Sequence, residues 1–287
     1  APSVVFSHDT RHFSREFVEL SAQIVAGMGG TAYLFAEDRS TPELSFAVRH
    51  FGAQAGVEVT ASHNPSHDNG YKVYFSDGAQ IVEPHASGII REVEAAQDGA
   101  SDAVPKSEGK VVRIGSEVDQ AYREALQELV VEGEMLKREG AKLKVVFTPL
   151  HGTGIRIVPA MLKSVGVPVS IVPAQEKGDG RFPTVRSPNP ENGEALAMGI
   201  ELAKKEKADL VVATDPDADR MGVALRNAQG EYELITGNQI GSLLAAYRMD
   251  RMRARGWIQP GQEKSCCLIK TFVTTDLQKE MAESVGM

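Results

Sequence analysis

One order of predicted elements occurs twice along this chain, and that repetition constrains the fold more than any other feature of the sequence. Residues 1–135 and 140–255 each contain strand, helix, strand, helix, strand, polar loop, hairpin and helix in that order. Short apolar runs that alternate with stretches of helical periodicity are typical of βαβ units. We therefore predict an α/β protein built from repeated three-layer α/β/α domains with mixed sheets.

The element boundaries follow from apolar periodicity, turn residues and helix caps. In the first copy we predict strands at 3–6, 31–35, 57–60, 71–75 and 80–82, and helices at 14–28, 41 to about 56, 84–96 and 117–132. In the second copy we predict strands at 143–149, 167–172, 210–213, 221–226 and 232–235, and helices at 155–164, 193–205 and from 238 onward. Residues 97–109 are polar and rich in turn formers, which indicates a connector.

A third copy begins near the end of the sequence. We predict a strand at 265–269 and a helix from Thr275 or Asp276 onward, so that 262–287 is the start of a third, incomplete domain. Because one strand and one helix cannot bury both faces of a sheet, we expect the natural protein to continue past Met287. The abrupt apolar start at Ser3 suggests that residues precede it as well.

Composition narrows the classes of function. A formal charge of −8 without a basic stripe argues against nucleic acid as a partner. No apolar run approaches the ~18 residues that a membrane span needs, and no secretory leader is recognisable, so we expect no membrane partner and a cytoplasmic location. The adjacent Cys266 and Cys267 lie in an apolar stretch suited to a buried strand, and we interpret them as inert core residues. The oligomeric state stays open between monomer and homodimer.

The polar loop after the third strand of the first copy contains Ser62, His63 and Asn64. Loops at the carboxyl ends of strands are where open α/β sheets place ligands. A serine hydroxyl can carry a phosphate, and a neighbouring imidazole can donate to a phosphate oxygen. Ser, Asn and Pro are also common in ordinary turns, so these residues alone support a phosphate carrier and a plain polar turn about equally.

The corresponding loop of the second copy contains Asp215, Asp217 and Asp219. Three carboxylates at alternate positions of an extended loop lie on one side and repel each other unless a cation joins them. Oxygen ligands favour Mg²⁺ or Ca²⁺ over zinc, and a calcium loop is excluded because Arg220 and Arg226 occupy its glycine and glutamate positions. Mg²⁺ keeps positions open for phosphate, so we favour a magnesium site over an acidic surface turn.

Four basic residues lie near these loops, either shortly after a strand end or at the start of the next strand. Lys72 starts the strand after the serine loop, where a nearby metal or arginine would lower its pKa and suit it to proton transfer. Arg11, and less so Arg15, follow the first strand and point to the same sheet edge, although surface salt bridges are the ordinary alternative. Arg220 can pair with the aspartates or hold a phosphate.

Taken together, several motifs resemble the α-D-phosphohexomutase superfamily. They are Thr-Ala-Ser-His-Asn-Pro at 60–65, Asn-Gly-Tyr-Lys at 69–72 and Asp-Pro-Asp-Ala-Asp-Arg at 215–220. Further segments resemble its phosphoglucomutase/phosphopentomutase branch: 41–49, 148–154 with a His151-Gly152 turn that could bind an anion, 182–185, 187–191 and 236–241. The resemblance spans nearly the whole chain.

This resemblance implies specific roles. Ser62 would be the phosphoserine, and Mg²⁺ would be bound by Asp215, Asp217, Asp219 and the seryl phosphate. Lys72 and His63 would assist proton transfer, while Arg11 and Arg220 would hold phosphate charge. Glucose 1,6-bisphosphate would be the intermediate and activator. The family has four domains, and its N-terminal Gly-Thr-x-Gly-x-Arg segment, sugar-recognition loop and second phosphate loop are not found in this chain.

We therefore expect a phosphoglucomutase-type enzyme that interconverts sugar 1-phosphates and 6-phosphates, with glucose as the first choice of sugar. Phosphopentomutase or phosphomannomutase activity remains an alternative, because the loop that selects the sugar is not in this sequence. This chain alone is expected to be inactive. Two other classes remain: an aspartyl-phosphate phosphatase with Asp215 as nucleophile, and a non-catalytic Mg²⁺- and phosphate-binding fragment.

Overall fold

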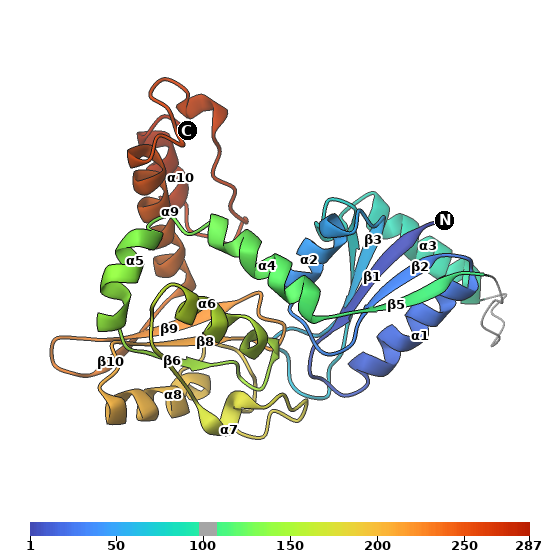
Figure 1. Ribbon diagram of the computed structural model, residues 1–287, viewed down its shortest axis with the longest axis horizontal. Helices are drawn as coiled ribbons and strands as arrows, with labels where there is room; N and C mark the ends of the chain where they lie inside the picture. Colours follow the sequence, from blue (N-terminus) through green and yellow to red (C-terminus); the bar gives the residue numbers. More distant parts are fainter. Residues whose placement is uncertain (98–107) are drawn as a thin grey trace.

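The computed structural model describes residues 1–97 and 108–287 and contains two α/β units, each built on one five-stranded sheet (Figure 1). Most of the predicted connector at 97–109 lies outside these residues. Helix α4 (Ser116–Glu128) runs between the two units, and α5 (Gly133–Glu139) follows it. Across the described ranges, no helix is both long enough and apolar enough to cross a membrane.

The first sheet has the strand order β4-β3-β1-β2-β5. Its strands are β1 (Ser3–His8), β2 (Thr31–Phe35), β3 (Ala55–Val59), β4 (Tyr71–Phe75) and β5 (Lys110–Ile114). Only β4 runs antiparallel to its neighbour. The edge strand β5 was not predicted, because its half-exposed residues follow a polar connector. The segment predicted as a strand at 80–82 forms only an isolated bridge between Gln80 and Tyr74.

Both faces of this sheet are covered by helices, which confirms the three-layer prediction. Val5 and Phe6 are neighbours on β1 and point to opposite faces. Val5 packs in the cluster that includes α2 (Thr41–His50) and α4, whereas Phe6 packs in the cluster that includes α1 (Ser14–Gly27). A fourth helix, α3 (His85–Gln97), follows β4.

The second sheet repeats this topology with the order β10-β9-β8-β6-β7. Its strands are β6 (Val145–Thr148), β7 (Val169–Ile171), β8 (Leu210–Thr214), β9 (Met221–Arg226) and β10 (Tyr232–Ile235). The helical segments around it are η1 (Gly140–Lys142), η2 (Thr153–Arg156), α6 (Val158–Ser164), α7 (Pro173–Glu176), α8 (Gly193–Glu206) and α9 (Gly237–Ala254). Strands β9, β8, β6 and β7 correspond to β4, β3, β1 and β2, so the predicted repeat is confirmed for these four strands, whereas the edge strands β5 and β10 have no counterpart strand in the other sheet.

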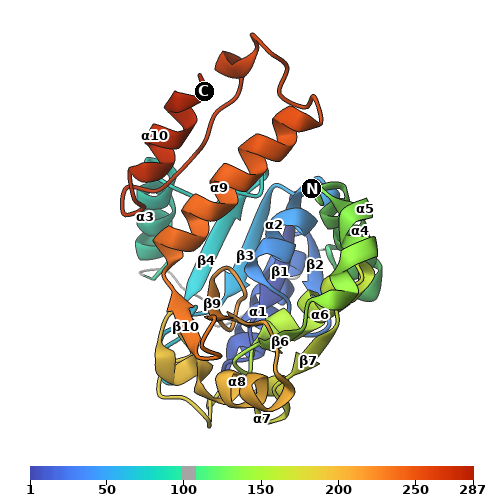
Figure 2. The same cartoon turned by 90° about the vertical axis from the view of Figure 1, so that its left-hand side faces the viewer.

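The C-terminal segment differs from its prediction. Residues 265–269 were expected to form a strand, but η3 (Glu263–Ser265) is followed by extended chain, and within the described residues no strand pairs with it. An extended segment becomes a strand only when a neighbour supplies ladder hydrogen bonds. Cys267 is therefore exposed and Cys266 half-buried, and the prediction that both are core residues was wrong. Helix α10 (Leu277–Ser284) lies beside α9 (Figure 2).

A buried carboxyl group at the start of α2 predicts how stability depends on pH. Glu43 is fully buried, and burial, followed by the nearby Asp119, raises its pKa to about 8 from 4.5. The folded state thus keeps a proton that the unfolded chain releases. The stability that the protonated, buried carboxyl group allows is therefore lost as the pH rises from 4.5 to about 8. We expect Glu43→Gln to flatten this part of the pH dependence in urea unfolding. Glu16→Gln, on the exposed side of α1, should keep the wild-type slope.

Candidate active site

The serine loop of the first unit meets the aspartate loop of the second unit. The serine loop follows β3, and the aspartate loop follows β8, the corresponding strand of the repeat. The Ser62 hydroxyl donates to Asp215 Oδ2 at 2.8 Å across this boundary. Two loops that are 153 residues apart in sequence thus form one site.

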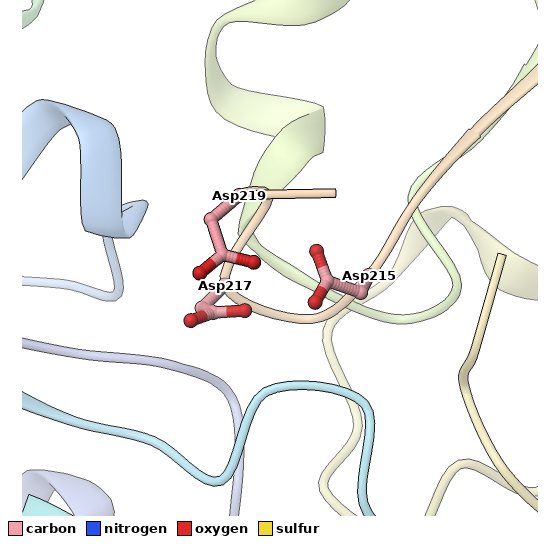
Figure 3. Close-up of side chains that lie close together, drawn as sticks. All are labelled: Asp215, Asp217 and Asp219. Carbon is pink, nitrogen blue, oxygen red and sulfur yellow. The ribbon is translucent and has the colours of Figure 1, made fainter. Parts of the chain in front are cut away.

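The three aspartates of the second loop converge, as Figure 3 shows. One carboxylate oxygen from each of Asp215, Asp217 and Asp219 lies within 4.8 Å of the others. Burial, followed by the charges of the other two aspartates, raises the pKa of Asp215 to about 8. Asp217 Oδ1 is buried and accepts no hydrogen bond from any residue that the structure describes. An all-oxygen set with an unpartnered buried oxygen fits a hard divalent cation such as Mg²⁺.

Ser62 is held in an uncommon backbone conformation. Its φ is +52°, in the left-handed region that side-chain-bearing residues rarely adopt. The Ser62 N–H donates to Thr60 Oγ1 at 2.9 Å, and Ser62 Oγ lies 3.2 Å from His63 Nδ1. Burial, followed by the charge of Arg220, lowers the pKa of His63. The imidazole beside the hydroxyl is therefore favoured in its neutral form, which can accept a proton.

Arg11 holds the serine loop in place through hydrogen bonds to its main-chain carbonyl groups. Its Nη1 donates to the carbonyls of Pro65 and Asp68, and its Nη2 donates to those of Ser62 and Asn64, at 2.7 to 3.1 Å. Its Nε pairs with Asp9 Oδ2 at 3.1 Å. The four Nη N–H groups of the guanidinium are thus directed at carbonyls of the serine loop, and Nε is buried without a hydrogen-bond partner among the described residues. The prediction that Arg11 holds phosphate charge is not supported by this geometry, because the four Nη N–H groups donate to carbonyls and Nε is buried.

Asp9 and Thr60 are parts of the site that the sequence analysis did not single out. Asp9 is fully buried and accepts hydrogen bonds from the Arg11 N–H, from Ser14 Oγ and from Thr60 Oγ1 at 2.7 to 3.0 Å. Burial raises its pKa to about 6, although Arg11 opposes this shift. A carboxylate directly after a buried strand, two residues before an arginine, was the available signal. These two residues fix Arg11 and the start of the serine loop.

Lys72 joins the serine side of the site to the aspartates. Its Nζ lies 2.8 Å from Asp217 Oδ2 and 3.5 Å from Asp219 Oδ2. Partial burial lowers the pKa of Lys72, but the charges of both aspartates outweigh burial and raise it. Carboxylates face the ammonium group here, so the fall in pKa that was predicted for a lysine near a metal or arginine stays a prediction for the metal-bound site.

The remaining basic candidates differ in their availability. The Arg220 side chain lies at the rim of the site, where it is about half exposed and 3.9 Å from the Asp219 carboxylate. The backbone N–H of Arg220 donates to Asp215 Oδ1 at 3.0 Å. Arg15 is exposed and pairs with Glu19 along α1. His151 is buried, with ring nitrogens 2.9 Å from Thr184 Oγ1 and 3.2 Å from the Lys177 carbonyl. Of these, only Arg220 is placed to reach a phosphate bound at the aspartates.

Two family models match the chain. Residues 1–100 match domain I and residues 120–230 match domain II of the α/β/α domains of phosphoglucomutase/phosphomannomutase. The phosphoglucomutase of Staphylococcus aureus strain N315 is 40% identical over 286 residues, which is 98% of this chain and 50% of that protein. That of strain MRSA252 is 39% identical over 285 residues, with 98% and 49% covered. The chain thus spans about half the length of the curated relatives it matches.

Solved structures of phosphomannomutase and phosphoglucomutase/phosphomannomutase family proteins also resemble this chain. A putative phosphomannomutase from Thermus thermophilus superimposes with a TM-score of 0.70 at 30% identity, over 87% of this chain and 53% of that one. A phosphoglucomutase/phosphomannomutase family protein from Burkholderia thailandensis has a TM-score of 0.65 at 22% identity, over 88% and 51%, and supports the fold alone. Both similarities extend across the two α/β units that form the site.

Proposed function

Because the chain belongs to the α-D-phosphohexomutase superfamily, we propose that it supplies the phosphoserine and Mg²⁺ centre of a phosphoglucomutase-type enzyme. The observation that carries the proposal is the 2.8 Å contact between the Ser62 hydroxyl and Asp215, within a cluster of three aspartates. A phosphate on Ser62 would lie beside the same oxygens that suit a divalent cation. Glucose phosphate is the proposed substrate, with a mannose or pentose phosphate as the alternative.

In the proposed reaction, a hydroxyl of a sugar monophosphate attacks the phosphorus of phosphoserine 62. The new bond joins phosphorus to the sugar oxygen, and the bond to Ser62 Oγ breaks. Neutral His63 takes up the proton of the attacking hydroxyl and passes it to Ser62 Oγ, which lies 3.2 Å from its Nδ1, as that oxygen leaves phosphorus. Arg220 at the rim pairs with phosphate charge. The bisphosphate then reorients and returns its other phosphate to Ser62, so that the net change moves phosphate between the 1 and 6 positions.

Other residues of the site have separate proposed roles in cation binding, in proton transfer and in holding the serine loop. Asp215, Asp217 and Asp219 would hold Mg²⁺ together with the seryl phosphate, and the bound ion would supply positive charge beside the transferring group. Lys72 adds a second positive charge on the same side and assists proton transfer. Arg11 holds the serine loop instead of binding phosphate. Glucose 1,6-bisphosphate is the proposed intermediate and activator.

Other parts of the proposal concern the whole protein. We assign the phosphoserine domain to 1–135, the metal-binding domain to 140–255 and part of a third domain to 262–287. A cytoplasmic location, as a monomer or homodimer, is part of the same proposal. The phosphatase alternative has less support, because it explains neither the third aspartate of the cluster nor the contact of the Ser62 hydroxyl with Asp215.

Removing the divalent cation should stop phosphate transfer. We expect an EDTA-treated sample to lose transfer from glucose 1,6-bisphosphate to Ser62 by on the order of 10²-fold or more, since metal stabilisation of transferring phosphate is worth several kcal/mol. Added Mg²⁺ should restore it, whereas NaCl at the same ionic strength should not. Mass spectrometry of the intact chain measures the phosphate gained. Equal transfer in EDTA would contradict the metal assignment.

A further inference from the structure

We propose that Thr41, at the start of α2 in the first unit, is a positioning residue of the cation site in the second unit. It holds Asp217 so that Oδ1, and not Oδ2, faces the ion. This inference rests on the proposed function, because it assigns the ligand atom within the aspartate cluster. It concerns a residue 176 positions away from Asp217 that touches the carboxylate without being a ligand.

Thr41 binds Asp217 through two hydrogen bonds. The Thr41 N–H donates to the Asp217 carbonyl at 2.9 Å, and Thr41 Oγ1 donates to Asp217 Oδ2 at 2.9 Å. Both residues are buried, Thr41 with 8% and Asp217 with 0% of its surface exposed. One bond fixes the main chain of the aspartate loop and the other fixes the rotation of the carboxylate. A two-point attachment of this kind defines both position and orientation.

The two oxygens of Asp217 consequently differ. Oδ2 accepts from Thr41 Oγ1 and also from Lys72 Nζ at 2.8 Å. Oδ1 is buried and unpartnered among the residues in the described ranges. Leaving a buried acceptor without a partner destabilises the folded state, and more so for a charged group. Such a cost is offset when a ligand supplies the missing partner, which identifies Oδ1 as the atom directed at the cation.

The position of Thr41 is fixed by its surroundings. Ser40 caps α2 by accepting from the Glu43 N–H at 3.3 Å, and Pro42 occupies the first turn. Arg156 of the second unit donates to Asp38 at 2.6 Å, three residues before Thr41. The segment that carries Thr41 is therefore attached to the second unit at two points. Thr41 can orient Asp217 because these contacts hold the start of α2 against the aspartate loop.

Direct cation binding tests this inference without relying on turnover. Mn²⁺ is the probe, since free Mn²⁺ is measured by its paramagnetic resonance signal and it accepts the same oxygen ligands. We expect Thr41→Val to weaken Mn²⁺ binding by about 10–100-fold, the usual effect of losing a group that orients a ligand. Thr41→Ser keeps the hydroxyl and should restore near-wild-type affinity. Should Thr41→Val fail to fold, Thr41→Ala removes the same bond.

Thr153→Val is the matched control. Thr153 is buried, its hydroxyl donates to the Pro216 carbonyl of the same loop at 2.9 Å, and its N–H donates to that oxygen at 2.8 Å. This variant therefore removes a buried hydroxyl beside the aspartate loop without touching a carboxylate, and it should weaken Mn²⁺ binding far less. Equal affinity in Thr41→Val and wild type would overturn the role of Thr41 while leaving the proposed function. Equal losses in Thr41→Val and Thr153→Val, or no restoration in Thr41→Ser, would also overturn it. Absence of Mn²⁺ binding to wild type would contradict both.

Discussion

Replacing Ser62 with alanine should abolish sugar-phosphate mutase activity in the enzymatically active protein. Loss of a nucleophile that forms a covalent intermediate lowers turnover by on the order of 10⁴–10⁶-fold, because no other group accepts the phosphate. The fold should persist, since alanine and serine carry the same Cβ at a φ of +52° and only the hydroxyl contacts to Asp215 and His63 are lost. A coupled assay of glucose 6-phosphate formation measures the effect.

Ser66 supplies the control for this experiment. It lies in the same loop, four residues beyond Ser62, and Ser66→Ala should keep most of the activity. A comparable loss in both variants would indicate a disturbed loop and not a missing phosphate carrier. Substantial turnover by Ser62→Ala would contradict the proposed mechanism.

Replacing Arg11 with methionine should produce the largest loss of stability among the site residues. Arg11 and Asp9 form an ion pair with both side chains fully buried, and breaking such a pair by removing one partner costs about 3–5 kcal/mol. Four carbonyls of the serine loop would lose their donor at the same time. Urea unfolding, followed by circular dichroism, measures the change in the free energy of unfolding.

Arg15→Met is the matched control, four residues further along the chain. Arg15 is exposed and pairs with Glu19 at 3.1 Å on the surface of α1, an arrangement worth about 0–1 kcal/mol. If the two variants were equally stable, Arg11 would not organise the loop. If Arg11→Met were stable but could not accept phosphate, direct phosphate contact, as expected from the sequence, would be the better assignment.

The repeat made most of the fold predictable from the sequence. Tyr71–Phe75, Met221–Arg226 and Tyr232–Ile235 have the predicted boundaries, because turn residues delimit them clearly. Strand β5 was missed because it is a half-exposed edge strand whose pairing with β2 is visible only in three dimensions. The segment 265–269 was misassigned because an apolar run indicates a strand whether or not a neighbour is present to pair with it.

The site was predictable to the extent that its residues follow strand ends. Ser62, His63, Lys72 and the aspartates come together as the family resemblance implied, although their roles in the reaction stay predictions. The supporting contacts were not predictable. Whether Arg11 faces phosphate or loop carbonyls depends on backbone positions that are 51 to 57 residues away. The local sequence pattern does not predict which backbone groups so far away along the chain a side chain will contact.

The most direct test is to locate phosphate on this chain after incubation with Mg²⁺ and glucose 1,6-bisphosphate, using peptide mass mapping. We predict phosphate on the peptide that contains Ser62, and its loss in Asp217→Asn, because the aspartates and the serine loop form one site. Phosphate on Asp215 or on another serine of the folded chain, with the Ser62 peptide unmodified, would contradict the assignment of Ser62 as the carrier.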